Sequence, residues 1–204
     1  MRGEGVADDR YAVYRGLLGA VRSWDESEAG GRAVGVTVRS AVTEFGEVSV
    51  AVRGGAVVGC QFMPAERLGE RFGGGRDEAS EVVLADTAIA EVVGFLAGEV
   101  REFSVPFRLG VSEFDNRVLT ALTERVGYGT TVSYGWLARE LELPITASRA
   151  VGKALAGNPV LVIVPCHRVV GSSGALTGYA GGLEVKRGLL DLESTPDSGD
   201  LRLF

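Results

Sequence analysis

The alternation of apolar and polar residues predicts β-structure over residues 34–63. Three short, valine-rich runs occur there, VGVTVRSA, EVSVAVRG and AVVGCQFM, and the pair Gly54-Gly55 between the last two predicts a tight hairpin turn. Apolar residues then recur with helical spacing over residues 78–100, which predicts one long helix. Strands followed by a helix are typical of a small α+β unit, which we place at residues 34–104.

The second half of the chain has the pattern of successive helices. Helical periodicity is found within residues 111–126, 127–143 and 145–159, and Ser112 and Ser133 are suitable N-cap residues for the first two helices. The last two helices are short and closely spaced, as in a helix-turn-helix motif. An apolar strand, a hairpin and a final helix are expected to follow.

The third of these helices is made mostly of small residues. The small side chains of Ser148, Ala150 and Gly152 would let a partner approach the helix backbone closely. Arg149 and Lys153 each add one long cation. One interpretation is a helix packed closely against a neighbour. The other is a helix whose backbone enters a narrow space such as a DNA minor groove, with one cation to insert.

Length and composition are those of an ordinary globular protein. The chain has 204 residues, of which 46% are apolar and 24% are charged, enough for one large domain or two small ones. We divide it into a helical extension (1–33), the α+β domain (34–104) and a mostly helical domain (105–204) that holds the helix-turn-helix and a strand followed by a turn. Residues 8–24 are the helix expected in the extension. The predicted fold class is therefore α+β.

The negative charge of the chain is unevenly distributed. The whole chain has a net charge of −6. Residues 1–104 carry 11 Lys/Arg and 17 Asp/Glu, whereas residues 105–193 carry 9 and 8. The second half therefore repels a polyanion less than the first, and the net charge does not exclude DNA as a partner. Binding is then expected to depend on shape and insertion more than on a broad basic face.

Cysteine content and hydropathy indicate the expected compartment. No apolar run reaches the roughly 18–20 residues that a membrane helix needs, and the N-terminal residues lack the apolar core of a signal peptide. We therefore expect a cytoplasmic protein that keeps Cys60 and Cys166 reduced. These two residues and His167 are the only cysteines and histidine of the sequence, which is too few for a structural zinc site.

Reactive chemistry is indicated at Pro165-Cys166-His167-Arg168, directly after the strand predicted at 160–164. A thiol reacts as its thiolate, and a histidine that accepts its proton makes it a usable nucleophile. Neighbours on an extended strand point to opposite faces, so joint action of Cys166 and His167 requires a turn at Pro165 or a bridging water. The other interpretation is a buried structural cysteine beside a hydrogen-bonded histidine.

The surrounding sequence resembles the O6-alkylguanine-DNA alkyltransferases, repair proteins that move an alkyl group from guanine to their own cysteine. The likeness runs through TVSYGWLA, SRAVGKALAGNP, NPVLVIVPCHRVVGSSGALTGYAGG and GGLEVKRGLLDLE, and covers about residues 112–193. Two earlier segments, TEFGEVSVAVRGGAVVGCQF and FLAGEVREFSVPFRLG, are similar more loosely to the family's first hairpin and interdomain segment. The resemblance implies a ribonuclease H-like N-terminal domain and a single, irreversible transfer of the alkyl group to Cys166.

The resemblance also assigns roles to polar residues around the cysteine. Cys166 would accept the alkyl group, His167 would act as its base through a water, and Glu193 would orient and polarise His167. Asn158 would connect the helix-turn-helix to the turn at the cysteine, although a helix C-cap is the simpler function for it. Tyr134 would contact the rotating nucleotide and donate toward the guanine ring, where a core tyrosine is the alternative.

Further residues are implied for the DNA and for the extruded base. The base must leave the stack through the minor groove, and Arg149 would fill its space in the duplex. The implied DNA-contacting residues are Tyr134, Ser148, Arg149, Ala150, Gly152 and Lys153. The implied base pocket consists of Val169, Tyr179, Ala180 and Gly181. In this pocket the carbonyls of Cys166 and Val169 would accept from the exocyclic amine, and the amide of Ala180 would reach O6. Lys186 lies near these residues in the sequence and receives no role.

The resemblance implies double-stranded DNA containing O6-alkylguanine as the partner, with no cofactor, no metal ion and no membrane. We expect a monomer, and whether O4-alkylthymine is also repaired is left open. Two other functions compete with this one. An alkyltransferase-like protein binds the lesion without repairing it but lacks a cysteine at the position of Cys166. An unrelated cysteine hydrolase or redox protein would turn over a small substrate in the absence of DNA.

Overall fold

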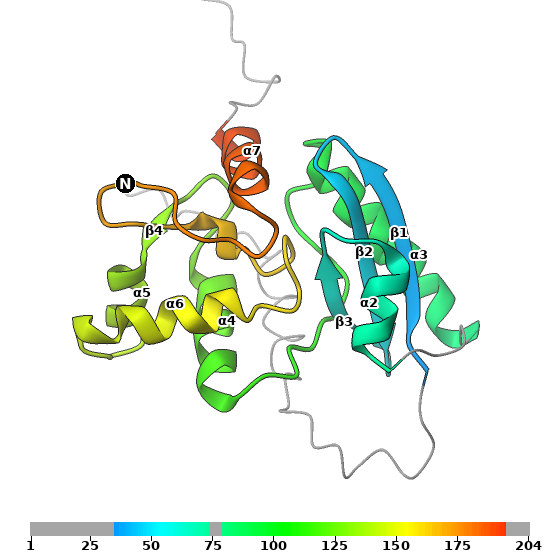
Figure 1. Cartoon of the computed structure of the whole chain (residues 1–204), viewed down its shortest axis with the longest axis horizontal. Coiled ribbons are helices and arrows are strands. Elements are labelled where there is room, and N and C mark those ends of the chain that lie inside the picture. Colours follow the sequence, from blue (N-terminus) through cyan, green and yellow to red (C-terminus); the bar gives the residue numbers. More distant parts are fainter. Residues whose placement is uncertain (1–34, 74–78, 195–204) are drawn as a thin grey trace, which may run out of the picture.

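A three-stranded antiparallel sheet forms the centre of the first half of the protein (Figure 1). The computed structural model describes residues 35–73 and 79–194, so the helix predicted at 8–24 lies outside the described residues. The sheet has the order β1-β2-β3, and its strands are β1 (Thr37–Thr43), β2 (Gly46–Arg53) and β3 (Ala56–Gln61). Gly54 and Gly55 turn the chain between β2 and β3 with φ values of 57° and 73°. Because both values are positive, the turn requires glycine-like residues and the predicted hairpin is confirmed.

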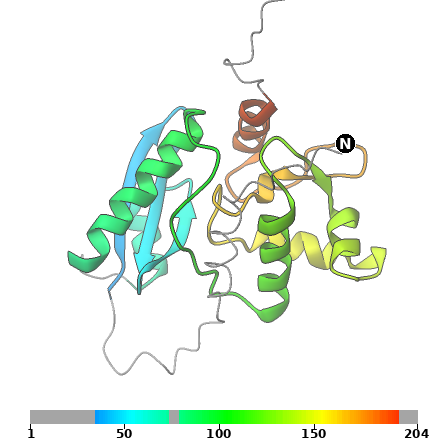
Figure 2. The ribbon, with the colours of Figure 1, turned by 180° about the vertical axis from the view of Figure 1, so that it is seen from behind.

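Helices cover the two faces of this sheet. α3 (Ala79–Leu96) packs on the face that carries Val50, and α2 (Ala65–Arg71) packs on the face that carries Ala51. In Figure 2, which shows the molecule from behind, α3 lies in front of the sheet. α2 lies on the opposite side, which is the side seen in Figure 1. The alternation along β2 explains this arrangement, because successive side chains of a strand point to opposite faces. The sequence predicted α3 but missed α2.

The second half contains the three predicted helices. They are α4 (Glu113–Arg125), α5 (Tyr134–Glu140) and α6 (Ser148–Ala156), with the short turn η2 (Ile145–Ala147) between the last two. The side chain of Ser112 accepts a hydrogen bond from the backbone of Asp115, and that of Ser133 accepts one from Trp136. Both predicted N-caps are therefore confirmed. The compact turn between α5 and α6 gives the helix-turn-helix.

The strand predicted at Val160–Val164 is instead a tight turn. The Val164 amide donates to the Val160 carbonyl at 3.0 Å, and Val162 has a φ of 71°, which is rare for a β-branched residue. The 3₁₀ turn η3 (Cys166–Arg168) follows directly, so the chain does bend after the proline. The strand prediction failed because a short, buried apolar run has no periodicity that distinguishes an extended segment from a turn.

The end of the chain packs beside the helix-turn-helix. β5 (Val169–Val170) pairs in parallel with β4 (Val132–Ser133), so the hairpin expected after the cysteine is replaced by a pairing with a distant strand. A loop then leads to the last helix, α7 (Leu183–Ser194). In Figure 1, α7 lies at the top, between the sheet and the helices of the second half.

The two halves meet through backbone and side-chain contacts. Near the end of β3, the backbone amide of Cys60 donates to the Pro159 carbonyl at 2.9 Å, and the Cys60 carbonyl accepts from the Leu161 amide at 2.8 Å. One cluster of buried apolar residues also includes members of both halves, such as Val50 and Leu189. No helix in the described parts of the chain is long and apolar enough to cross a membrane.

Candidate functional site

Asn158 determines the position of the cysteine. Its side chain is buried, donates to the Val164 carbonyl at 3.0 Å and to the Cys166 sulfur at 3.2 Å, and accepts from the Val160 amide at 2.9 Å. One amide side chain thus holds both ends of the turn and the thiol itself. Gln61 supports it from the sheet, donating to the Asn158 carbonyl at 3.2 Å.

His167 is fully buried and is held by a carboxylate from the last helix. Its Nε2 lies 2.8 Å from Oε1 of Glu193, and its ring packs edge-on against Phe95 and Tyr179. Its other nitrogen, Nδ1, is buried and has no hydrogen-bond partner among the described residues. The 3₁₀ turn gives no direct hydrogen bond between His167 and Cys166 in this part of the chain. Nδ1 is therefore the nitrogen that remains for the thiol.

The charges of these groups are set mainly by their burial. Burial raises the pKa of the Cys166 thiol to about 11, although the hydrogen bond from Asn158 and the charge of Lys186 lower it. Burial also lowers the pKa of His167, against the opposite effect of Glu193. At neutral pH the pair therefore rests as a thiol beside a neutral imidazole, which is the form that can accept a proton.

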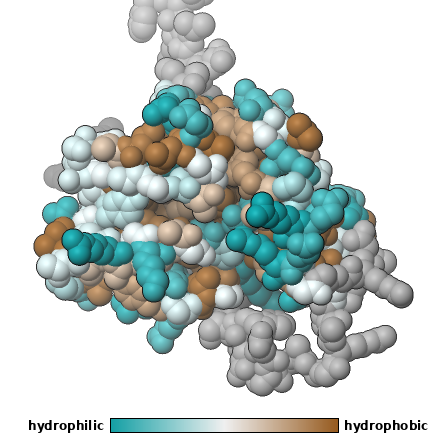
Figure 3. Space-filling model, viewed as in Figure 1, coloured by the Kyte–Doolittle hydropathy of each residue, from teal (hydrophilic) through white to brown (hydrophobic). Residues whose placement is uncertain are grey.

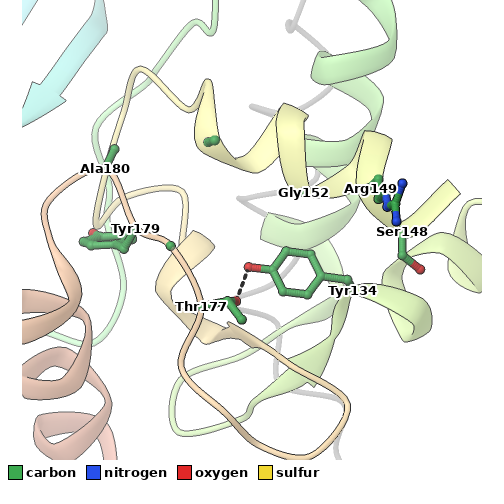
Figure 4. Close-up of a pocket in the computed structure, with 9 residues that line it drawn as sticks. Tyr134, Ser148, Arg149, Gly152, Thr177, Tyr179 and Ala180 are labelled. Atoms are coloured by element: carbon green, nitrogen blue, oxygen red, sulfur yellow. Dashed lines mark hydrogen bonds between the residues drawn. The ribbon is translucent and has the colours of Figure 1, made fainter.

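A separate, open cavity of about 550 Å³ lies beside this cluster and faces the helix-turn-helix (Figure 4). It is bounded by the first residue of α5, by one side of α6 and by the loop before α7. Among the described residues its walls are Tyr134, Ser148, Arg149, Gly152, Ala156, Thr177, Gly178, Tyr179 and Ala180. Cys166 is not among them, and Tyr179 belongs both to this wall and to the surroundings of His167.

The structure brings most, but not all, of the predicted residues together. Cys166, His167, Glu193 and Asn158 form one buried cluster, while six of the predicted DNA and pocket residues line the cavity. Ala150 and Lys153 lie on the exposed surface of α6. Val169 is buried and Gly181 packs between Tyr179 and Phe62, and neither is part of the cavity wall.

The surface differs in polarity between α2 and α6. Figure 3 shows that hydrophilic residues gather over α2, whereas the region of α6 mixes hydrophilic and apolar residues. Within the described residues, no group of three or more His, Cys, Asp or Glu side chains is placed to hold a metal ion.

Comparison with known proteins identifies the family. Residues 113–195 match the family described as "6-O-methylguanine DNA methyltransferase, DNA binding domain". An inducible methylated-DNA–protein-cysteine methyltransferase of Bacillus subtilis is 41% identical over 155 residues, which are 74% of this chain and 85% of that protein. The chain belongs to this methyltransferase family. A Mycobacterium tuberculosis member is 47% identical over 117 residues, which are 57% of this chain and 70% of that protein.

Solved structures of the family share the fold of this chain. The crystal structure of the Mycobacterium tuberculosis O6-methylguanine methyltransferase is 36% identical, with a TM-score of 0.68 over 79% of this chain and 96% of that chain. A structure of the same organism's OGT in complex with DNA is 34% identical, with a TM-score of 0.64 over 77% of this chain and 92% of that chain. The α+β fold class predicted from the sequence is therefore confirmed.

Arg168 is a residue of the buried cluster that the sequence did not predict. It donates to both oxygens of Glu193, through Nε and Nη2 at 2.9 Å each, and to the Val126 carbonyl at 2.8 Å. Burial by itself raises the pKa of Glu193, but the hydrogen bonds from His167 and Arg168 outweigh it and lower that pKa to about 2. The available signal was an arginine beside a predicted buried turn, because a buried guanidinium needs a carboxylate.

Lys186 is a second buried cation, and it lies in the first turn of α7. Its side chain is fully buried, and its ammonium group donates to the Val169 carbonyl at 2.6 Å and to the Thr177 carbonyl at 3.0 Å. Burial lowers the pKa of Lys186, and the nearby thiol raises it. The lysine thus connects β5, the cavity loop and α7.

Proposed function

We propose that this protein repairs DNA by direct reversal, taking the alkyl group of O6-alkylguanine irreversibly onto Cys166. One arrangement carries the proposal. A buried thiol hydrogen-bonded by Asn158 stands beside a His167–Glu193–Arg168 series, next to a cavity walled by a helix-turn-helix. The names of its relatives, one of them solved in complex with DNA, point to the same activity.

The proton of the thiol leaves as the new bond forms. With a pKa of about 11 for Cys166, making the free thiolate at pH 7 costs on the order of 5 kcal/mol. We therefore propose that neutral His167 accepts the proton through a bridging water while sulfur attacks the alkyl carbon. Glu193, ionised and held by Arg168, stabilises the imidazolium that results.

Electrons and atoms balance without a cofactor. The sulfur electron pair forms the S–C bond, and the pair of the broken C–O bond stays on the guanine oxygen. The guanine anion takes back one proton, so the products are unmodified guanine and an S-alkylated Cys166. A thioether is not hydrolysed under these conditions, and each molecule is expected to act once.

The cavity is proposed to receive the base after it leaves the duplex. Arg149 on α6 would fill the gap in the stack, and the small residues Ser148 and Gly152 would let the helix backbone approach the minor groove. Ala150 and Lys153 would contact the DNA backbone from the exposed side of α6.

The proposed base contacts come from both sides of the cavity. Tyr134 would donate to the ring, and Tyr179, Ala180 and Gly181 would close over the base. The carbonyls of Cys166 and Val169 would accept from the exocyclic amine. Each of them already accepts one bond, from the Val169 amide and from Lys186 respectively, and a carbonyl oxygen has a second lone pair for this purpose.

We propose that the protein acts as a monomer in the compartment that holds the DNA, which is the cytoplasm in our interpretation. We also propose that the chain is divided into an extension (1–33), a ribonuclease H-like domain (34–104) and an alkyltransferase domain (105–204). O6-alkylguanine in duplex DNA is the proposed substrate.

A repair titration tests the function. A duplex carrying one O6-methylguanine inside a restriction site is resistant to cleavage until the methyl group is removed. Increasing amounts of protein should restore cleavage in direct proportion, one duplex for each molecule, and longer incubation should not increase the yield. Cys166→Ala should restore none, while Cys60→Ala, which removes the other buried thiol, should behave as wild type. Repeated turnover, or repair by Cys166→Ala, would contradict the proposal.

A further inference from the structure

Thr177 and Tyr134 both line the cavity, and their hydroxyl groups are in hydrogen-bond contact. The Tyr134 oxygen lies 2.7 Å from Oγ1 of Thr177, and either atom can be the donor. Figure 4 shows this bond bridging the start of α5 and the loop that precedes α7. The two residues are 43 positions apart in the chain, so the bond is a product of the fold.

Both partners of this bond are held in place. The Thr177 carbonyl accepts from the buried ammonium group of Lys186 at 3.0 Å, and a β-branched side chain on a fixed backbone has few rotamers. The Tyr134 ring rests on α6 at Gly152, where an added Cβ would lie 3.5 Å from the ring. The hydroxyl groups are therefore presented to each other by rigid surroundings.

The direction of this bond decides what Tyr134 offers to the cavity. A tyrosine hydroxyl has one hydrogen to donate and can also accept. If Tyr134 donates to Thr177, its hydrogen is occupied. If Thr177 donates instead, the Tyr134 hydrogen is available to a ligand. A flipped purine presents a ring nitrogen that can only accept, so it selects the second arrangement.

We propose that Thr177 is a positioning residue for alkyl transfer, which rests on the function proposed above. It donates to the Tyr134 oxygen and thereby directs the Tyr134 hydrogen at a ring nitrogen of the alkylguanine. When the C–O bond breaks, the charge left on the base spreads to its ring nitrogens. A donor polarised by a second hydrogen bond stabilises that charge more than the neutral base, so the effect falls on the rate of transfer more than on binding.

Single-turnover kinetics on a duplex with one O6-methylguanine test this inference. Thr177→Val keeps the shape of the side chain and removes the hydroxyl, whereas Thr177→Ser keeps the hydroxyl. Thr177→Val should lower the transfer rate at saturating DNA by about three- to tenfold, with the DNA dissociation constant changed less than about twofold. Thr177→Ser should retain the wild-type rate within about twofold. In a Tyr134→Phe background, Thr177→Val should have no further effect, because the group it orients is gone.

Three results would overturn the inference: a wild-type rate in Thr177→Val, an equal loss in Thr177→Ser, or an undiminished loss in the Tyr134→Phe background. Thr177→Ala gives the same comparison if the valine variant unfolds at a lower temperature. The proposed function is judged separately, because wild type must transfer the methyl group and Cys166→Ala must not, whatever Thr177 does.

Discussion

At the residue scale, the resting thiol is protected and not activated. Cys166 and His167 are both buried, and burial favours the uncharged form of each. The hydrogen bond from Asn158 is the largest interaction that favours the thiolate, and the charge of Lys186 adds to it. Reactivity is therefore expected to depend on a correctly placed alkyl carbon, which suits a protein that can be used only once.

Thiol labelling should show this protection. In the free protein, the rate at which iodoacetamide labels the Cys166 peptide should keep rising beyond pH 9, because burial raises its pKa to about 11. Asn158→Ala removes a donor to the sulfur, raises the thiol pKa further and should slow labelling at a fixed pH by about three- to tenfold. Peptide mass spectrometry separates Cys166 from Cys60. Equal or faster labelling of Asn158→Ala at every pH would contradict this assignment.

The Arg168–Glu193 pair should be the most costly side-chain interaction to break. Arg168→Met leaves a buried carboxylate beside neutral His167, and we expect a loss of about 3–5 kcal/mol in the free energy of unfolding in urea at pH 7. The matched control is Arg187→Met on α7, the helix that carries Glu193. Arg187 forms an exposed i,i+3 pair with Glu184, and its loss should cost less than about 1 kcal/mol. Similar losses for the two variants would show that the buried pair is not structurally important.

The same carboxylate predicts a dependence of stability on pH. The pKa of Glu193 falls from 4.5 to about 2 on folding. The stabilisation by ionised Glu193 is therefore complete above about pH 4.5 and is lost as the pH falls toward 2. The loss in the free energy of unfolding is about 3 kcal/mol. Urea unfolding of wild type between pH 2 and 7 should show this loss, and Glu193→Gln should remove that part of it. A pH dependence unchanged in Glu193→Gln would contradict the assignment.

At the element scale, local signals predicted what local interactions determine. The caps at Ser112 and Ser133 and the Gly54-Gly55 turn depend on neighbouring residues, and all three were predicted. The turn at 160–164 could not be predicted, because its apolar run has no periodicity and the sheet residue Cys60, which bonds to it, is distant in sequence. α2 was missed because seven residues give too short a periodic pattern.

Helix α6 allows a direct comparison of two cations. Arg149 and Lys153, one turn apart, are both exposed, but Arg149 lines the cavity and Lys153 does not. Arg149→Ala should slow transfer from duplex DNA by about tenfold or more, because the flipped state loses the group that fills the stack. The rate with single-stranded DNA should change much less. Lys153→Ala should weaken duplex binding modestly without a selective loss of transfer, and an equal effect of both changes on the duplex transfer rate would contradict insertion by Arg149.

At the scale of the whole molecule, the first half of the chain supports the site from behind. Cys60 and Gln61 bond to the backbone at Asn158, Pro159 and Leu161. In the described structure this half adds no wall to the cavity, yet it fixes the residue that holds the thiol. The family resemblance located the reactive residues in the second half of the chain. The contacts from the first half join residues about a hundred positions apart, so they have no signal in the sequence.

The contact between the β1–β2 turn and α7 tests this support. A Cβ at Gly188 would lie 2.5 Å from the ring of Phe45, so Gly188→Ala should lower the free energy of unfolding by about 1–3 kcal/mol. In a Phe45→Ala background the same change should cost almost nothing. Chemical unfolding measures both. An equal cost in the two backgrounds would show that the halves do not meet at this point.

The central claim is that Cys166 keeps the alkyl group, and peptide mass spectrometry tests it most directly. The protein is incubated with excess duplex containing O6-methylguanine, digested and compared with protein exposed to unmodified duplex. The account predicts that the peptide with Cys166 gains the mass of one CH₂ in nearly every molecule, and that the peptide with Cys60 gains none. An unchanged Cys166 peptide after the lesion has been bound, or a methyl group on another residue, would contradict it.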